Sequence, residues 1–230
     1  MKYLIKFYTI IIVCIIFSFD LYAEEKIKIG LVVPLTGENK ELGETVLNSV
    51  RLAINDINDD NIEIVPNSKK LDWEVELGII IGKDAKHISQ EDSRSHILGY
   101  CLVNDLSERE WQIEKMGQWV KGKSHDTYGP IGPYLVTKDE IKDVNNLNMS
   151  LDLNGSRMQT GNTNTMVFNV DVIVSYVSKF MSLQPGDIIT TGTPPGVGMG
   201  MKPQKFLKAE DELKLTIDNL GEQKSKLVAI

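Results

Sequence analysis

Cysteine and histidine are both scarce in this 230-residue chain, which contains two cysteines and three histidines. Cys14 lies in the apolar N-terminal run, so Cys101 has no partner in the body of the chain and no intramolecular disulfide is available there. Cys101 falls within an apolar strand pattern, which predicts a small buried core residue rather than a nucleophile. The histidines lack metal-ligand spacing, which favours surface or packing roles for His87, His96 and His125.

Excess positive charge is also lacking, because 25 Lys and Arg face 32 Asp and Glu, for a formal net charge of −7. No basic stripe offsets this balance, so nucleic acid is not expected as a partner. The glycines at 196, 198 and 200 do not form a phosphate-cradling motif, and there is no internal repeat or low-complexity segment. The chain is 42% apolar and long enough to bury a core, as one large or two small globular domains.

Long apolar runs are missing as well. The N-terminal run from Phe7 to Phe19 has 13 uncharged residues, fewer than the roughly 20 that a membrane span needs. Lys2 and Lys6 precede this run and Ala23 follows it, which is the order of charges and small residues in a secretory signal peptide. We therefore predict a signal peptide at residues 1–23, a periplasmic or secreted product and no stable membrane span after cleavage. An uncleaved anchor is the alternative.

Residues 24–66 have the pattern of a single β-α-β unit. Strand patterns at 27–33 and 61–65 flank a segment with helical apolar spacing. Through IGLVVPLTG and SVRLAINDIN the unit resembles the start of a type I periplasmic binding protein of the penicillin-binding-protein-activator-like group. Only this first unit matches and neither lobe of such a protein is complete, so periplasmic solute binding is the weakest of the functions considered.

The stretch from Leu71 to Gly132 contains the most informative pattern, the pair Glu74 and Glu76. Side chains alternate along a strand, so these two carboxylates are expected to project from one face. Asp105 ends a nearby apolar run and is a natural third ligand. Three carboxylates together favour a hard divalent ion, Mg²⁺ or Mn²⁺. A solvated strand face is the alternative reading of the pair.

The rest of this region is rich in strand patterns. Asn154-Gly155 predicts a tight hairpin turn, and residues 170–181 have helical spacing with Val170, Ile173, Val174, Val177 and Met181 on one face. Further strands are predicted at residues 77–81, 99–103, 188–191 and 213–217.

Five ordered segments, DWEVELGIIIGK, GYCLVNDLSEREWQ, GKSHDTYGPIGPYLVTKDEI, LNGSRMQTGNT and LQPGDIITTGTPPGVG, cover residues 71–220. Through them the chain resembles the fumarylacetoacetate hydrolase family, most closely its ureidoglycolate lyase and hydroxyheptadienedioate isomerase-like members. The resemblance implies an α+β fold with a β-rich mixed-sheet roll over residues 71–230, preceded by the β-α-β fragment. It also implies a homodimer, and a metal-dependent hydrolase, lyase or isomerase of catabolism that acts on a small oxo- or hydroxy-dicarboxylate.

The same resemblance assigns roles to individual residues. Arg109 and Gln112, spaced from Asp105 as on one side of a helical turn, are expected to contact the substrate. Lys123 is expected to hold an oxo-acid and to stabilise a developing enolate or carbanion. Thr193, in a Gly- and Pro-rich loop, is expected to bind the substrate carboxylate.

One departure from the family keeps two functions open. Relatives carry a His-x-x-Glu acid–base pair before the metal-binding strand, whereas no His precedes Glu74 in this sequence. A positioned acid–base group typically contributes about 10²–10⁴-fold in rate. The chain is therefore expected to be either a metal-dependent enzyme or a catalytically impaired fusion remnant that binds only metal or ligand. Members of the family are ordinarily cytoplasmic, which conflicts with the predicted signal peptide.

Overall fold

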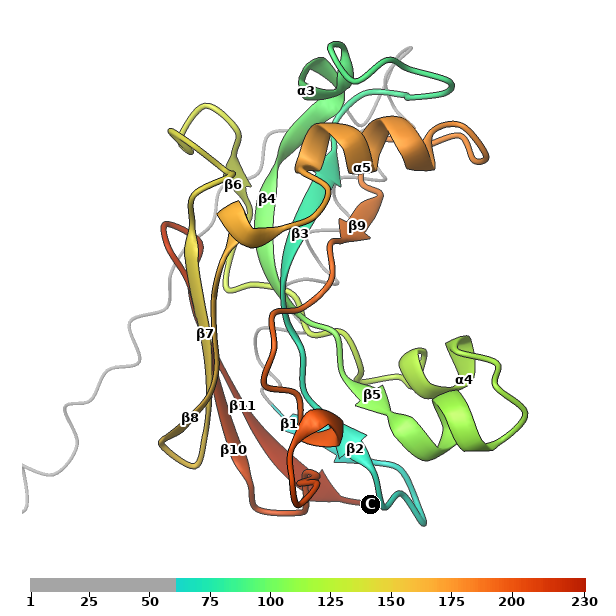
Figure 1. The fold of residues 1–230 in the computed structure, drawn as a ribbon, viewed down its shortest axis with the longest axis vertical. Coiled ribbons are helices and arrows are strands. Elements are labelled where there is room, and N and C mark those ends of the chain that lie inside the picture. Colours follow the sequence, from blue (N-terminus) through green and yellow to red (C-terminus); the bar gives the residue numbers. More distant parts are fainter. Residues whose placement is uncertain (1–60) are drawn as a thin grey trace, which may run out of the picture. The chain divides into compact units, whose positions relative to one another are not determined.

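A computed structural model of the chain describes residues 61–230. The predicted signal peptide and most of the β-α-β fragment lie outside the described residues. Within residues 61–230 the structure consists mainly of strands, with few and short helices (Figure 1). The α+β, strand-rich fold that the sequence predicts is therefore confirmed.

The larger of the sheets has five strands in the order β1-β11-β10-β7-β8. Neighbouring strands are antiparallel except for β1 and β11, which pair in parallel. Asn154 and Gly155 join β7 to β8 with φ values of 50° and 75°, as a tight hairpin turn with two left-handed residues requires, so the predicted hairpin is confirmed. The five strands are β1 (Asn61–Ile64), β7 (Asn148–Leu153), β8 (Ser156–Asn162), β10 (Glu212–Ile217) and β11 (Gly221–Ala229).

A second sheet has four strands in the order β6-β4-β3-β9, and β2 and β5 form a separate antiparallel pair. Figure 1 shows β3 and β4 as the long strands of the four-stranded sheet, with β9 beside them. The strands of both sheets are β2 (Leu71–Asp72), β3 (Val75–Ile81), β4 (Ile97–Asn104), β5 (Ser107–Glu108), β6 (Val136–Thr137) and β9 (Ile188–Thr190).

The helical elements are short. The α-helices are α3 (Ser93–His96), α4 (Val120–Lys123) and α5 (Val170–Val177), and the others are the π-helical turn η1 (Glu110–Glu114) and the 3₁₀ turns η2 (Thr163–Thr165) and η3 (Gly198–Gly200). Asn169 caps α5 by accepting a hydrogen bond from the Val172 N–H at 3.0 Å. None of the helices in residues 61–230 is long and apolar enough to cross a membrane.

Strand β3 lies at the centre of the structure. All seven of its residues are buried, because β4 and β9 flank it and both of its faces are covered. Leu77 packs in one hydrophobic cluster together with Leu151 of β7 and Leu215 of β10, so the two sheets share a core. The solvated face considered for this strand is therefore wrong, since Glu76 is only 2% exposed. Cys101 of β4 is buried, as predicted.

Three differences from the sequence-based expectation concern α5, β11 and β1. The helix predicted for residues 170–181 ends at Val177, and Met181 is 51% exposed instead of facing the core. Strand β11 has no counterpart among the predicted strands. Two of its inward positions are the polar residues Gln223 and Ser225, which hide the apolar alternation that identifies a half-buried strand. Strand β1, expected within the β-α-β fragment, pairs with β11 of the downstream region.

Candidate functional site

Three carboxylates converge where β3 begins and β4 ends. Glu74 directly precedes β3, Glu76 is its second residue and Asp105 directly follows β4. The antiparallel register opposes Val75 and Asn104, and the Asp105 N–H donates to the Glu74 carbonyl at 2.9 Å. One ligand oxygen from each carboxylate lies within 4.8 Å of the others. The structure thus brings together the three residues that the sequence proposed as metal ligands.

Lys123, at the end of α4, holds two of these carboxylates. Its Nζ donates to Glu74 Oε2 at 2.8 Å and to Asp105 Oδ2 at 2.6 Å. The lysine side chain is 20% exposed, so its ammonium group is partly open to solvent. A cation in this position offsets the repulsion between the two carboxylates and can also meet an anionic ligand.

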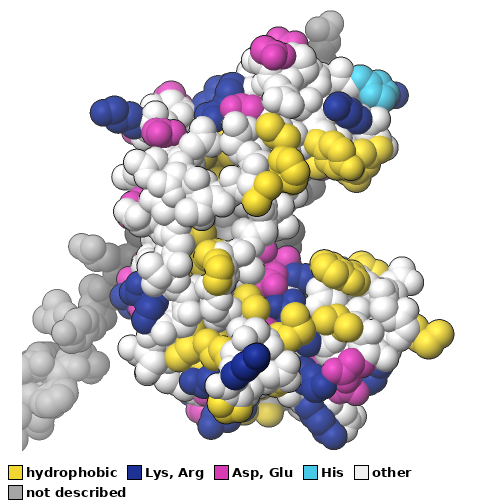
Figure 2. Space-filling view, viewed as in Figure 1, with side chains coloured by type: hydrophobic (Ala, Val, Ile, Leu, Met, Phe, Trp, Pro, Cys, Tyr) yellow, Lys and Arg dark blue, Asp and Glu magenta, His cyan; other side chains and the backbone are white. Residues whose placement is uncertain are grey.

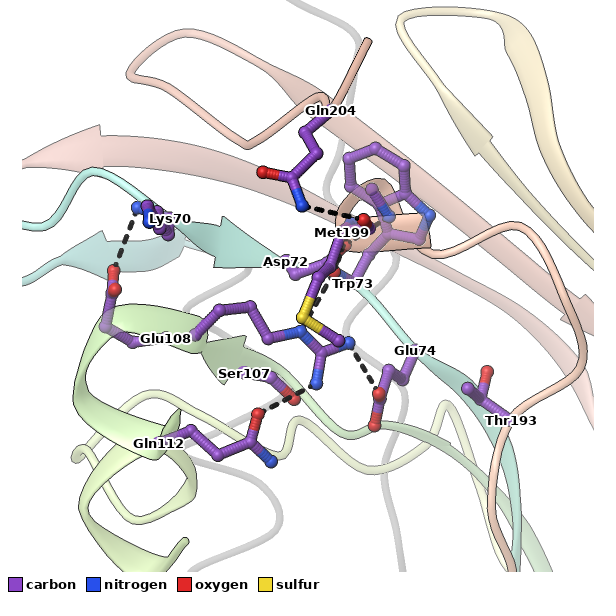
Figure 3. Close-up of polar contacts among 12 residues, drawn as sticks. Lys70, Asp72, Trp73, Glu74, Ser107, Glu108, Gln112, Thr193, Met199 and Gln204 are labelled. Carbon is purple, nitrogen blue, oxygen red and sulfur yellow. Dashed lines mark hydrogen bonds and ion pairs between the residues drawn. The ribbon is translucent and has the colours of Figure 1, made fainter. Parts of the chain in front are cut away.

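Arg109 is buried in a three-way network and is 5% exposed. It donates to Glu74 Oε1 at 2.7 Å, to Gln112 Oε1 at 3.0 Å and, through Nε, to Asp72 Oδ2 at 3.0 Å. Figure 3 shows Gln112, Asp72 and Glu74 around this position. Burial opposes the charge of Arg109, but the nearby carboxylates of Glu74 and Asp72 raise its pKa above the usual value. The guanidinium therefore fixes the orientation of Glu74.

The helical spacing proposed from Asp105 to Gln112 is wrong in detail. Residues Ser107–Glu108 form strand β5, and the π-helical turn η1 begins only at Glu110. Arg109 and Gln112 reach one another across this turn, whereas Asp105 approaches from the end of β4.

Asp72 is a site residue that the sequence reasoning missed. It is fully buried, and besides Arg109 its carboxylate accepts the N–H groups of Gly198 at 2.6 Å, Met199 at 2.9 Å and Trp73 at 2.9 Å. Asp72 thus ties the η3 turn to the strand that leads to Glu74. The sequence offers one indication of this role, because Asp72 is an acidic residue between the two apolar residues Leu71 and Trp73. Both neighbours are fully buried in the structure.

Glu76 is the most buried of the proposed metal ligands. Its Oε2 accepts the Gly192 N–H at 2.8 Å. The pKa of Glu76 is raised to about 8, mainly by burial; the nearby Asp105 and Glu74 also raise it, whereas the Gly192 N–H and Lys123 lower it. Without a metal, this carboxyl group is mostly protonated at neutral pH.

The donor set fits a hard divalent cation. Glu74, Glu76 and Asp105 offer only oxygen atoms, as Mg²⁺ and Mn²⁺ prefer. Together with Asp72 they make four carboxylates, which face the two cations Arg109 and Lys123, and a divalent charge would balance the difference. Such an ion would polarise a carbonyl or enolate oxygen of a bound ligand.

Thr193 lies in the loop that continues from β9 alongside the start of β3, near Glu74 (Figure 3). Its Oγ1 donates to the Val75 carbonyl at 2.9 Å and accepts from Gln159 Nε2 at 2.8 Å. A hydroxyl group has a single proton. In this arrangement the Thr193 hydroxyl therefore donates its proton to the strand between the two glutamates, and a hydrogen bond from it to a substrate carboxylate would replace this contact.

A hollow opens on one face of residues 61–230. Figure 2 shows acidic and basic side chains at its floor and hydrophobic side chains on both rims, which correspond to the α4 and α5 regions of Figure 1. Trp119 next to α4 is 67% exposed, and Tyr176 in α5 is 61% exposed. A charged floor between apolar rims suits a ligand with an anionic end.

The model of the fumarylacetoacetate hydrolase C-terminal family matches residues 49–228, more than half of the chain. The chain belongs to the fumarylacetoacetate hydrolase family. The match begins upstream of residue 71, where the sequence motifs placed the start of the resemblance. It therefore includes β1, in agreement with the pairing of β1 and β11.

Individual relatives agree with this assignment. A putative hydrolase from Burkholderia ambifaria is 58% identical over 165 residues, which cover 71% of this chain and 58% of the relative. The fumarylacetoacetate hydrolase structure from Exiguobacterium antarcticum has 37% identity and a TM-score of 0.69, covering 71% of this chain and 58% of that one. The 2-hydroxyhepta-2,4-diene-1,7-dioate isomerase from Mycobacterium marinum has 34% identity and a TM-score of 0.66, covering 74% and 63%. The chain thus spans about 58% of the length of the curated relatives it matches.

Proposed function

We propose that this member of the fumarylacetoacetate hydrolase family is a Mg²⁺- or Mn²⁺-dependent enzyme. Its substrate is a small oxo- or hydroxy-dicarboxylate of the ureidoglycolate or hydroxyheptadienedioate type. Its reaction is that of a hydrolase, a lyase or an isomerase. A hydrolase and an isomerase are both among the similar structures, which supports a reaction of this class. The proposed metal ligands are Glu74, Glu76 and Asp105, and the proposed substrate-binding residues are Arg109, Gln112, Lys123 and Thr193.

The convergence of Glu74, Glu76 and Asp105 around Lys123 carries this proposal. All of these reactions pass through negative charge on an oxygen next to the bond that changes, and a divalent ion with a neighbouring ammonium group stabilises such charge. Lys123 donates to two ligands of the proposed metal and still has a partly exposed side chain. It can therefore hold a ligand oxygen close to the metal.

A binding-only product is the second candidate function. It is favoured by a feature of the sequence, the lack of a His before Glu74. In that case the metal site and Lys123 would bind an oxo-acid, while turnover would lie about 10²-fold or more below that of a relative with a positioned acid–base group.

Calorimetry and turnover assays on the same preparation separate the two candidates. Metal-stripped protein should bind one Mn²⁺ or Mg²⁺, and Glu76→Ala should abolish this binding while the exposed-site variant Glu91→Ala retains it. Turnover of 2-hydroxyhepta-2,4-diene-1,7-dioate or fumarylacetoacetate that depends on the metal and on Lys123 supports the enzyme. Metal binding without turnover of either compound supports the binding-only product. The absence of metal binding refutes the enzyme and the metal site, and leaves at most a product that binds ligand alone.

A further inference from the structure

Gln159 of β8 is a fully buried polar residue whose side chain connects three segments. Its Oε1 accepts the Val75 N–H at 3.0 Å. Its Nε2 donates to Thr193 Oγ1 at 2.8 Å and to the Pro194 carbonyl at 2.8 Å. A single amide group thus joins the larger sheet to the strand of the proposed metal ligands and to the loop beside them.

The loop lies directly on β8 at this point. A Cβ atom added to Gly196 would come within 2.2 Å of the Met158 carbonyl oxygen, and one added to Gly161 would come within 2.6 Å of Pro194 Cβ. Gly196 also has a φ of 117°, a conformation that favours glycine. The loop is therefore packed closely against β8 next to the hydrogen bond between Gln159 and Thr193.

Val75 separates Glu74 from Glu76, and both of its backbone polar groups are bound by this network. Its N–H donates to Gln159, and its carbonyl accepts from the Thr193 hydroxyl. The backbone between the two glutamates is therefore held from the side of β8, independently of the Arg109 and Lys123 contacts on Glu74.

We propose that Gln159 is a positioning residue of the metal centre, which sets the backbone between Glu74 and Glu76 and directs the Thr193 hydroxyl towards that backbone. This inference rests on the proposed function, because it assumes that the two glutamates bind a divalent ion. The amide is suited to the role because it has both donors and an acceptor. A glutamate of the same shape would lose both donor contacts, and a methionine would lose all three.

Mn²⁺ affinity of the full chain, measured by calorimetry, tests the inference without any assay of turnover. Residues that orient metal ligands typically contribute about 10–100-fold to metal affinity. We expect Gln159→Met to weaken Mn²⁺ binding by about 10-fold or more and the exposed control Gln184→Met to leave it unchanged. The electron paramagnetic resonance spectrum of bound Mn²⁺ should change in Gln159→Met alone, which reports altered ligand geometry.

Thr193 variants provide the second arm, which also holds if Gln159→Met does not fold. Thr193→Val should weaken Mn²⁺ binding, because it removes the hydroxyl group that donates to the Val75 carbonyl. Thr193→Ser keeps a hydroxyl group and should keep the wild-type affinity. The loss in the Gln159→Met, Thr193→Val double variant should be smaller than the two single losses combined, because both act through Val75. If either folded variant, Gln159→Met or Thr193→Val, bound Mn²⁺ with an affinity within twofold of wild type, the role of Gln159 would be refuted but the proposed function would not. A wild-type chain that binds no Mn²⁺ would instead refute the proposed function.

Discussion

At the scale of single residues, the site is built from buried charges that are stable only as a network. Asp72 and Arg109 are almost inaccessible to solvent and hold one another, the η3 turn and Glu74. Removing one partner of a buried ion pair leaves an uncompensated charge, which typically costs about 3–5 kcal/mol. The metal-ligand strand therefore depends on residues that are themselves not proposed ligands.

Asp72→Asn tests this dependence. Each carboxylate oxygen of Asp72 accepts two N–H groups: Oδ1 accepts those of Trp73 and Gly198, and Oδ2 accepts those of Met199 and Arg109 Nε. The amide nitrogen of an asparagine would replace one of these oxygens and cannot accept, so two contacts must be lost. We expect the free energy of unfolding in urea to fall by about 3 kcal/mol. Asp84→Asn, in an exposed turn, is the matched control and should change it by less than about 0.5 kcal/mol. Equal stability of the two variants would contradict the network.

Glu76 predicts a pH dependence of the metal-free protein. Burial raises its folded pKa to about 8, above the value of 4.5 for an unperturbed glutamate. The folded state therefore binds more protons than the unfolded state between these values. The contribution of Glu76 to stability is fully present below about pH 4.5 and is lost as the pH rises through about 8.

Thermal unfolding of metal-stripped protein between pH 5.5 and about pH 8.5 should show this loss as a falling Tm. Glu76→Gln has no ionisable group at the position, so its Tm should fall less over the same range. A Tm of the wild-type protein that parallels that of Glu76→Gln across this range would show that the Glu76 carboxyl group is not held in its neutral form.

At the scale of elements, the sequence predicted the strands that are marked by apolar runs or by apolar alternation. It missed β11, two of whose inward positions are polar, and the two-residue strands β5 and β6. The strands around Glu76, Cys101 and Leu215 are present, and the turn at Asn154-Gly155 forms as its residue types require. Strand β11 escaped because Gln223 and Ser225 occupy inward positions. The parallel pairing of β1 with β11 could not be predicted, because it joins segments 165 residues apart, such as Asn61 and Lys226.

The candidate site divides in the same way. Glu74, Glu76 and Asp105 could be proposed because alternation and an apolar run locate them within their own segments. Asp72 and Gln159 could not, because their roles come from contacts with distant segments, such as Gly198 for Asp72 and Thr193 for Gln159. Whether Arg109, Gln112, Lys123 and Thr193 bind a substrate stays a prediction.

The short helix α4 depends on a close contact that a glycine permits. A Cβ atom added to Gly122 would come within 2.5 Å of Gln112 Cβ and within 2.6 Å of the Glu108 carbonyl oxygen. Gly122→Ala must therefore displace α4 and the neighbouring Lys123. We expect a loss of about 1–3 kcal/mol of stability together with weaker Mn²⁺ binding.

Gly200→Ala is the control for this change. A Cβ atom at Gly200 would meet only Val197 Cγ2 at 3.8 Å, an ordinary contact. Urea unfolding and Mn²⁺ calorimetry on both variants test the packing of α4 against η1. If Gly122→Ala matched Gly200→Ala in both measurements, α4 would not be held where the structure has it.

At the scale of the whole molecule, exposed apolar side chains agree with the homodimer that the family resemblance implies. Val167 is 89% exposed, and Phe168, Tyr176 and Phe180 are 61–62% exposed on or near α5. Aromatic side chains of this kind are enriched in the cores of protein interfaces. We predict a dimer by light scattering at micromolar concentration, and a shift towards monomer in the Phe168→Ser, Phe180→Ser double variant. A wild-type monomer would contradict the prediction.

Diffraction from crystals grown with Mn²⁺ shows whether Glu74, Glu76 and Asp105 hold one divalent cation. We predict one strong anomalous peak at the manganese absorption edge, about 2.0–2.2 Å from an oxygen of each of the three carboxylates. In that structure the Lys123 ammonium group should lie beside the metal ion, in contact with the carboxylate oxygens of Glu74 and Asp105, and not at the position of the metal ion. Fully occupied Mn²⁺ at another site, or no anomalous peak among the three carboxylates at millimolar Mn²⁺, would show that these carboxylates do not form the metal site.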